Sequence, residues 1–180
     1  MRKMDILAWI FGAGAMASLI VMNQVKKREG MLAAKLSADV FWGAHYLCLG
    51  AIGGMIPNIV GIFREIVYMN RKKHKWASSP LWPALFVTVI FLLGLRSFKS
   101  AINILPITGS CCATLVLWFQ RPRLTKFVLI FVSAAFLIYD IFVGSYIGII
   151  NEVFGISSAI IYFSREAISK RREKNEKGVQ

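Results

Sequence analysis

Seven long apolar segments, separated by short polar or charged connections, constrain this chain more than any other feature of its sequence. They lie near residues 5–22, 33–50, 52–69, 80–95, 102–119, 127–143 and 145–164. A helix needs about 20 mostly apolar residues to cross a bilayer, and somewhat fewer where the bilayer thins. A chain of 180 residues that is 57% hydrophobic has more apolar surface than a soluble core of that size buries. We therefore expect an all-α integral membrane protein with seven transmembrane helices, whose main partner is the lipid bilayer.

The net charge of +13 raises the question of nucleic-acid binding. The Lys and Arg residues form short clusters between apolar segments instead of one continuous basic face, so we expect no nucleic-acid partner. The three cysteines lack the spacing of zinc ligands, and the sequence contains no hydrolase, metalloprotease or phosphate-loop motif. We expect a protein that is not an enzyme and that has no cofactor and no metal site.

The basic residues are distributed unequally between the two sides that seven helices would define. Sixteen Lys and Arg residues lie in the C-terminal segment and in the connections after the first, third and fifth apolar segments, whereas four lie on the other side. Because positive residues are retained in the cytoplasm, an external N-terminus and a cytoplasmic C-terminus are predicted. Residues 167–180 are then a basic cytoplasmic tail near anionic lipid, and the part from Ser169 to Gln180 is expected to be frayed.

The third and seventh apolar segments repeat one another. A shift of 94 residues places Gly50 on Gly144, Gly54 on Gly148, Gly61 on Gly155, Ile62 on Ile156, Ile66 on Ile160, Tyr68 on Tyr162 and Arg71 on Arg165. The fourth apolar segment has no charged residue and suits a linker. We therefore predict a first three-helix repeat in residues 1–70, an inverting linker with the fourth helix in residues 71–100, and a second, parallel three-helix repeat in residues 101–166.

Three stretches carry a resemblance to a known family: "GAHYLCLG" in the second segment, "ILPITGS" in the fifth and "GSYIGIINE" at the start of the seventh. From about Ser37 to Arg165 the chain resembles the YgjV family of bacterial inner membrane proteins, and more distantly the SWEET, SemiSWEET and PQ-loop transporters. The resemblance implies a location in the bacterial inner membrane and a SWEET-like fold of three, one and three helices. For the wider superfamily it implies alternating-access passage of small polar solutes. The chain departs from that superfamily in its prolines, since only Pro106 matches the usual kink positions and no Pro-Gln pair occurs.

Polar residues inside the apolar segments are the candidates for a solute site, because such residues usually face protein or water. Asn151 and Glu152 lie on a face of small residues in the seventh segment, and the 94-residue shift places Asn58 on Glu152. Parallel repeats hold a substrate site between their halves, so Asn58 and Glu152 are expected to line one central cavity. The other candidates are His45, Asn103, Thr108 and Asp140.

Several of these polar residues also have a purely structural interpretation. His45 suits packing as well as binding, and Asp140 suits a gate or a turn cap as well as a binding contact. Lys35 and Asp39 are four residues apart on one predicted helix, which favours an internal ion pair. Arg64 is expected to act as an anchor whose long side chain reaches the headgroups.

Asn103 and Thr108 flank Pro106 in the fifth segment. A proline inside a helix frees the carbonyl four residues before it, here that of Ile102. An amide, a hydroxyl and a free carbonyl could coordinate a polar solute together, or they could form only a packing feature.

These patterns favour a small secondary transporter or facilitator of a small polar solute. The alternative is a non-transporting scaffold, or a subunit that stabilises a partner, in which the polar residues only join helices. Hydrogen bonds between membrane helices are worth about 0.6 kcal/mol on average, so they are easily maintained without transport.

The topology is testable with reporter fusions. Because residue 73 and the C-terminus are both predicted to be cytoplasmic, alkaline phosphatase fused at either point should be inactive and a fluorescent protein should be bright. Fusions after residue 99, in a connection predicted to be external, should give the reverse pattern. Residue 73 and the C-terminus on opposite sides of the membrane would contradict the seven-helix arrangement.

Overall fold

The computed structural model of the chain describes residues 3–25, 28–96, 100–119 and 121–177. These residues form seven α-helices, and no strand occurs among them. Short 3₁₀ turns, Lys75–Ser78 and Ala101–Asn103, precede the fourth and fifth helices. The predicted all-α architecture is therefore confirmed. The helices are α1 (Lys3–Gln24), α2 (Arg28–Cys48), α3 (Ile52–Asn70), α4 (Leu81–Arg96), α5 (Ile104–Phe119), α6 (Pro122–Val143) and α7 (Tyr146–Lys177).

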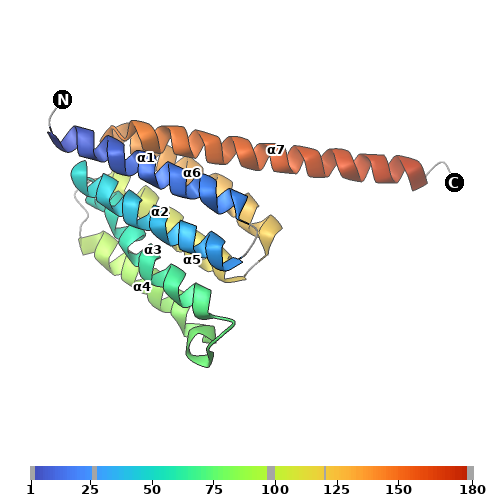
Figure 1. The fold of residues 1–180 in the computed structure, drawn as a ribbon, viewed down its shortest axis with the longest axis horizontal. Coiled ribbons are helices and arrows are strands. Elements are labelled where there is room, and N and C mark those ends of the chain that lie inside the picture. The colour runs from blue at the N-terminus through green and yellow to red at the C-terminus, as the bar shows by residue number, and fades with distance from the viewer. Residues whose placement is uncertain (1–2, 26–27, 97–99, 120, 178–180) are drawn as a thin grey trace.

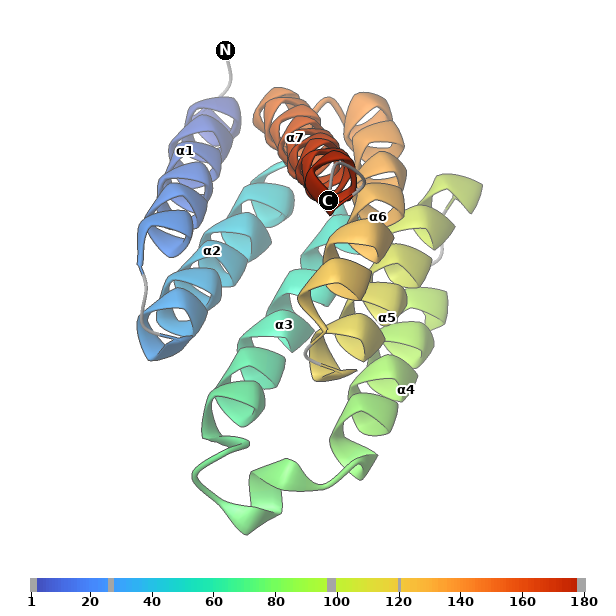
Figure 2. The same ribbon diagram turned by 90° about the vertical axis from the view of Figure 1, so that its right-hand side faces the viewer.

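Helices that follow one another in the sequence mostly pack side by side (Figures 1 and 2). α2 lies between α1 and α3, and α6 lies between α5 and α7. Contacts of α3 with α5 and of α1 with α7 join these two groups, while α4 packs against α3 and α5. The two groups of three helices thus meet along two seams, and the polar site described below lies where α2 meets α6 and α7.

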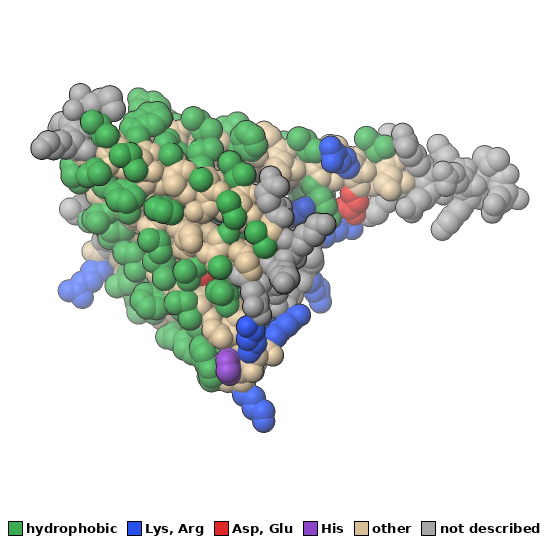
Figure 3. All heavy atoms as spheres, in the orientation of Figure 1, with side chains coloured by type: hydrophobic (Ala, Val, Ile, Leu, Met, Phe, Trp, Pro, Cys, Tyr) green, Lys and Arg blue, Asp and Glu red, His purple; other side chains and the backbone are tan. Residues whose placement is uncertain are grey.

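Many large apolar side chains are exposed on the bundle, and they cover much of the face shown in Figure 3. Leu81 and Phe154, for example, expose 74% and 73% of their surface. Five helical stretches are long and apolar enough to cross a membrane: Met4–Met22, Ile52–Asn70, Ala101–Phe119, Arg123–Val143 and Tyr146–Ser169. The remaining two predicted spans are also helices, but α4 is shorter and α2 carries charged residues. An apolar surface of this extent is expected to face lipid.

α7 continues well beyond the predicted span and projects from the bundle to Lys177 (Figure 1). The expectation of a frayed segment from Ser169 is therefore wrong for residues 169–177, which are helical. No Gly or Pro occurs between Gly155 and Gly178, and strong helix formers fill this stretch. A polar sequence with good helix propensity can extend a helix that packing has already started.

Proline positions also differ from expectation. α5 begins at Ile104, so Pro106 lies in its first turn, where the missing N–H has no helical partner to lose. Pro106 therefore does not interrupt the helix. Pro57 does lie inside a helix, α3, and it deprives the Gly53 carbonyl of its usual helical donor.

A buried ion cluster joins α2, α3 and α5. Asp39 pairs with Lys35, as their spacing predicts, and Asp39 Oδ2 lies 3.8 Å from Arg64 Nη2. The Arg64 guanidinium also pairs with Glu65 at 3.0 Å and donates to Thr114 Oγ1 at 3.0 Å. Arg64 is only 5% exposed, so the prediction that it reaches the headgroups is wrong. Two carboxylates inside the bundle hold its guanidinium there instead.

The same face of α3 makes further polar contacts with α5. The Tyr68 hydroxyl donates to the Thr114 carbonyl at 3.0 Å. Arg71 donates to the Trp118 carbonyl, and its guanidinium carbon lies 3.7 Å from the centre of the Trp118 ring. Together with Arg64, these residues recur at helical spacing and hold α3 to α5 over two turns.

Replacing Arg64 should strongly destabilise the bundle. In Arg64→Met, the carboxylates of Asp39 and Glu65 lose a buried cation, and breaking such a pair costs about 3–5 kcal/mol. The measurement is the melting temperature of the purified protein in detergent. Arg96→Met, which removes an exposed cation at the end of α4, is the control and should melt like the parent. Equal melting temperatures for the two variants would contradict a stabilising ion cluster.

Candidate functional site

The turns that join α2 to α3 and α6 to α7 have the same backbone geometry, 94 residues apart. Gly50 and Gly144 both have positive φ, +68° and +71°, a region that residues with a Cβ rarely adopt. In each turn, the amide after the glycine donates to the carbonyl five residues earlier. These bonds, to Tyr46 and Asp140, measure 2.8 Å and 2.9 Å. The equivalence predicted from the sequence therefore extends to hydrogen bonds at this end of the bundle.

Tyr46 and Asp140 also meet through their side chains. The Tyr46 hydroxyl donates to Asp140 Oδ1 at 2.8 Å, and both residues are buried. Since the 94-residue shift places Tyr46 on Asp140, this hydrogen bond joins two equivalent positions. A contact of this kind is typical of the axis in a two-fold symmetric assembly, where a position meets its own counterpart.

The N-termini of α3 and α7 are capped at the same amide by different groups. In α7 the Ser145 hydroxyl accepts the Gly148 N–H at 3.2 Å, as a helix cap does. Ala51, at the equivalent place before α3, has no side-chain oxygen. The Tyr139 hydroxyl of α6 accepts the Gly54 N–H instead, at 2.9 Å. The Gly54 N–H also donates to the Ala51 carbonyl at 3.1 Å, so the Tyr139 hydroxyl is a second acceptor at this helix end and comes from the other group of helices.

His45 connects α1, α2 and the start of α7. Its Nδ1 lies 2.7 Å from the Ala8 carbonyl oxygen, and its Nε2 lies 2.7 Å from Ser145 Oγ. A carbonyl oxygen only accepts, so we assign the proton to Nδ1. In the neutral imidazole, Nε2 then accepts the Ser145 hydroxyl proton. Through Ser145, the ring of His45 reaches the neighbourhood of Asp140.

The second oxygen of Asp140 is a weakly paired acceptor. Asp140 Oδ2 is buried and forms no well-aligned hydrogen bond among the described residues, although the Ser145 side chain lies close enough to interact with the Asp140 carboxyl group. Oδ2 lies against Gly148, where an added Cβ would overlap both this oxygen and Ser145 Oγ. Because a weakly paired buried carboxylate oxygen is costly, Oδ2 is the atom of this cluster that is best prepared to accept a ligand donor.

Glu152 lies one turn further along α7. Its Oε1 accepts a hydrogen bond from Asn151 Nδ2 at 3.0 Å, and Ser133 of α6 also hydrogen-bonds its carboxyl group. Glu152 is close enough to Asp140 and Tyr46 to interact with them electrostatically. Two carboxyl groups therefore share the space between α2, α6 and α7.

The structure brings most, but not all, of the predicted site residues together. His45 and Asp140 lie in one buried cluster, and Asn151 and Glu152 lie beside it. Asn103 approaches from the 3₁₀ turn before α5, because a Cβ added at Gly53 would lie 2.8 Å from Asn103 Oδ1 and 3.1 Å from the Tyr139 hydroxyl.

Two predicted residues bind their own helices instead. Asn58 Nδ2 donates to the Gly54 carbonyl at 2.8 Å. Thr108 is exposed, and its hydroxyl donates to the Ile104 carbonyl at 2.8 Å. The structure therefore does not bring Thr108 to the cluster, and a cavity shared by Asn58 and Glu152 stays a prediction.

A cavity of about 340 Å³ borders the cluster beside α1. The rings of Trp9 and Tyr146 stack along one side, with centroids 6.3 Å apart. His45 and Asp5 supply its ionisable groups, and His45 is the predicted site residue that lines it. The lining comprises Asp5, Ala8, Trp9, His45, Leu49, Gly144, Tyr146 and Ile147.

Sequence reasoning missed three residues of the cluster: Tyr46, Tyr139 and Ser145. Two of them had a detectable signal. Tyr46 coincides with Asp140 under the 94-residue shift, and Ser145 follows a turn glycine just before an apolar run, as a helix cap does. Tyr139 had none, because its role depends on how α6 is placed against α3.

Comparison with known proteins agrees with this architecture. The sequence profile of the YgjV family, described as bacterial inner membrane proteins, matches residues 6–169. No curated protein and no solved structure matches the chain. The chain therefore belongs to the YgjV family, as its motifs predicted, and this membership supports a location in the bacterial inner membrane. The more distant relationship to SWEET and PQ-loop transporters stays a prediction.

Gly148 should tolerate no side chain. In Gly148→Ala the added methyl group would overlap Asp140 and Ser145, and overpacking of this kind costs about 1–3 kcal/mol. Gly43→Ala is the matched control, because its methyl group would meet Ile59 and Asn58 at ordinary distances of 3.8 Å and 3.9 Å. Thermal unfolding in detergent should show a lower melting temperature for Gly148→Ala alone. The same loss in both variants would mean that close packing at Gly148 is unimportant.

Proposed function

We propose that this YgjV family member is a small secondary transporter or facilitator, which moves a small polar solute across the bacterial inner membrane by alternating access. The observation that carries the proposal is the buried cluster of Tyr46, His45, Asp140 and Ser145 beside a cavity. Burying polar and ionisable groups in a membrane bundle is expensive, and such groups usually mark a pathway or a site.

The proposal includes two parallel three-helix units, residues 1–70 and 101–166, joined by a linker in residues 71–100. The shared geometry of the two turns and the hydrogen bond between the equivalent residues Tyr46 and Asp140 support it. Transporters built from parallel repeats hold their substrate between the halves. A movement of one unit against the other would part Tyr46 from Asp140 and make the Asp140 carboxyl accessible to a solute.

The chemistry of the cavity favours a solute that donates hydrogen bonds. Asp5 lines the cavity and Asp140 lies behind it, and both carboxyl groups accept hydrogen bonds when ionised. The stacked rings of Trp9 and Tyr146 offer an apolar wall for the flat face of a ring. We therefore propose a neutral or cationic solute with hydroxyl or amine groups rather than an anion. With the N-terminus outside, as the basic residues predict, this cavity opens to the outer side.

A catalytic role is less well supported, although the contact between Ser145 and His45 resembles a nucleophile and its base. Ser145 Oγ and His45 Nε2 lie at the distance of a nucleophile and its base. Ser145, however, is only 1% exposed, and its oxygen already accepts the Gly148 amide as a helix cap. We propose that the pair positions α7 and does not perform catalysis.

A non-transporting scaffold is the second candidate. It is favoured by Asn58 and Thr108, whose polar groups bind their own helices and need no solute. In a scaffold the Tyr46–Asp140 bond would stay closed, and its loss would affect stability alone.

Transport assays in proteoliposomes distinguish a transporter from a non-transporting scaffold. A panel of radiolabelled sugars, polyols, amino acids and amines should include at least one that enters vesicles containing the protein faster than empty vesicles. Asp140→Asn should lower that uptake by about tenfold or more, as expected for loss of one charge-assisted hydrogen bond. Arg96→Gln, at an exposed helix end, is the control. Uptake by Asp140→Asn at the parental rate would contradict the proposed site.

A further inference from the structure

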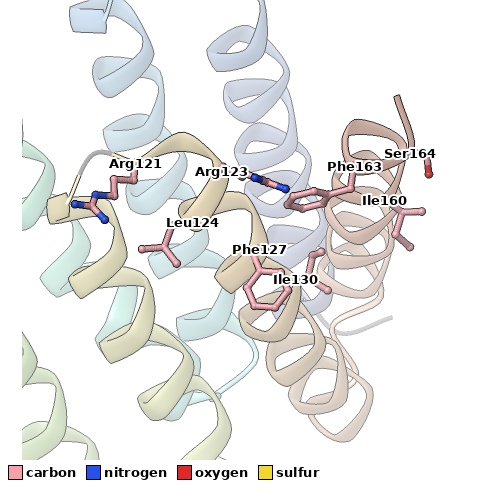
Figure 4. Close-up of a pocket in the computed structure, with 8 residues that line it drawn as sticks. All are labelled: Arg121, Arg123, Leu124, Phe127, Ile130, Ile160, Phe163 and Ser164. Atoms are coloured by element: carbon pink, nitrogen blue, oxygen red, sulfur yellow. The ribbon is translucent and has the colours of Figure 1, made fainter. Parts of the chain in front are cut away.

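A second cavity, of about 790 Å³, lies between α6 and α7 at the end of these helices opposite their connecting turn (Figure 4). Phe127 and Ile130 of α6 and Ile160 and Phe163 of α7 give it an apolar lining. Arg121 and Arg123 lie at the end of the groove where α6 begins. None of these residues belongs to the site proposed for transport.

The groove begins beyond a place where α6 and α7 lie close together. A Cβ added at Gly155 would lie 3.3 Å from Ser133 Oγ, so the two helices approach closely there. Further along α7, the residues that line the groove are Ile160, Phe163 and Ser164.

The groove end is rich in cations. Arg121 is exposed, and the side chain of Arg123 is 67% exposed, so both guanidinium groups are available. Lys126 lies one turn away, with its Nζ 3.4 Å from the centre of the Tyr162 ring. Glu166 pairs with Arg123 at 3.4 Å and offsets part of this charge. Guanidinium groups bind phosphate through paired, charge-assisted hydrogen bonds.

We propose that the groove binds one anionic phospholipid of the surrounding leaflet. Its phosphate group contacts Arg121 and Arg123, and an acyl chain lies along Phe127, Ile130 and Ile160. The apolar lining is complementary to hydrocarbon and not to a free phosphate or a nucleotide. The excess of cations at its end selects a net negative headgroup over a zwitterionic one.

The test is a titration of the purified, delipidated full-length protein with phosphatidylglycerol in detergent, followed by native mass spectrometry and by the melting temperature. We expect one tightly bound lipid and a rise in melting temperature. Arg121→Gln/Arg123→Gln should weaken binding by about thirtyfold, from about 1 kcal/mol for each cation removed. Lys72→Gln/Lys75→Gln removes the same charge from exposed positions before α4 and should bind like the parent. All four residues are exposed, so neither variant should lose its fold.

Three results would overturn the proposal. Phosphatidylcholine that binds as tightly as phosphatidylglycerol would show that the cations select nothing. Glycerol phosphate that produces the same shift without an acyl chain would show a site for free anions. Equal losses in the two double variants would show a general effect of net charge. Phe127→Ser keeps both Arg residues and should also weaken binding; parental affinity in this variant would rule out the acyl-chain contact.

Discussion

A polar side chain inside an apolar bundle needs a hydrogen-bond or ion-pair partner within the bundle, because no water is available there. In this chain many of these partners lie on other helices. Tyr46, His45 and Asp140 bind across α1, α2, α6 and α7, whereas Arg64 binds groups from α2, α3 and α5. Apolar surfaces alone determine weakly how far membrane helices slide along one another, because lipid is as apolar as the helices. The two polar clusters therefore determine the register of the bundle. The cavity beside α1 borders the first cluster, and His45 belongs to both.

The turns before α3 and α7 share their backbone geometry, but the side chains around these two helices differ. Gly61 lies against Asp39, and Gly155, its equivalent, lies against Ser133. The residue beside Gly61 is thus a carboxylate on α2, whereas the residue beside Gly155 is a serine on α6. Asp39 pairs directly with cations, but Glu152 is hydrogen-bonded by a serine hydroxyl and an amide and interacts more weakly with Lys35. Contacts with neutral groups break at lower cost than buried ion pairs, so the contacts of Glu152 are better suited to rearrange than those of Asp39.

Most of the fold could be predicted, because an apolar segment long enough to cross a bilayer forms a helix. The end of α7 could not, since a polar helix that projects from the bundle has the same composition as a tail without secondary structure. For the site, the sequence singled out His45, Asp140 and Glu152, because polar residues in apolar runs are conspicuous. It did not predict that Tyr139 caps α3, which depends on how α6 lies against α3. Arg64 was misassigned for the same reason: the carboxylate of Asp39 that retains it comes from another helix.

The caps at the two turns bear on how such a bundle could open. The Ser145–Gly148 bond lies within α7 and would survive any rigid movement of that helix. In the proposed two-unit arrangement, Tyr139–Gly54, Tyr46–Asp140 and His45–Ser145 cross between the units at the end that carries the two turns. Arg64 and Tyr68 make further hydrogen bonds between the units, to Thr114, nearer the other end. If the bundle opens only at the turns, the first three bonds break and the bonds to Thr114 remain. At about 1 kcal/mol net for each hydrogen bond, this opening would cost about 3 kcal/mol. With a free-energy difference of that size, about 1% of the molecules are in the open state. A solute that binds the open state more tightly can then make it the major state. The cluster is therefore strong enough to keep the bundle closed without a solute and weak enough to be opened by one.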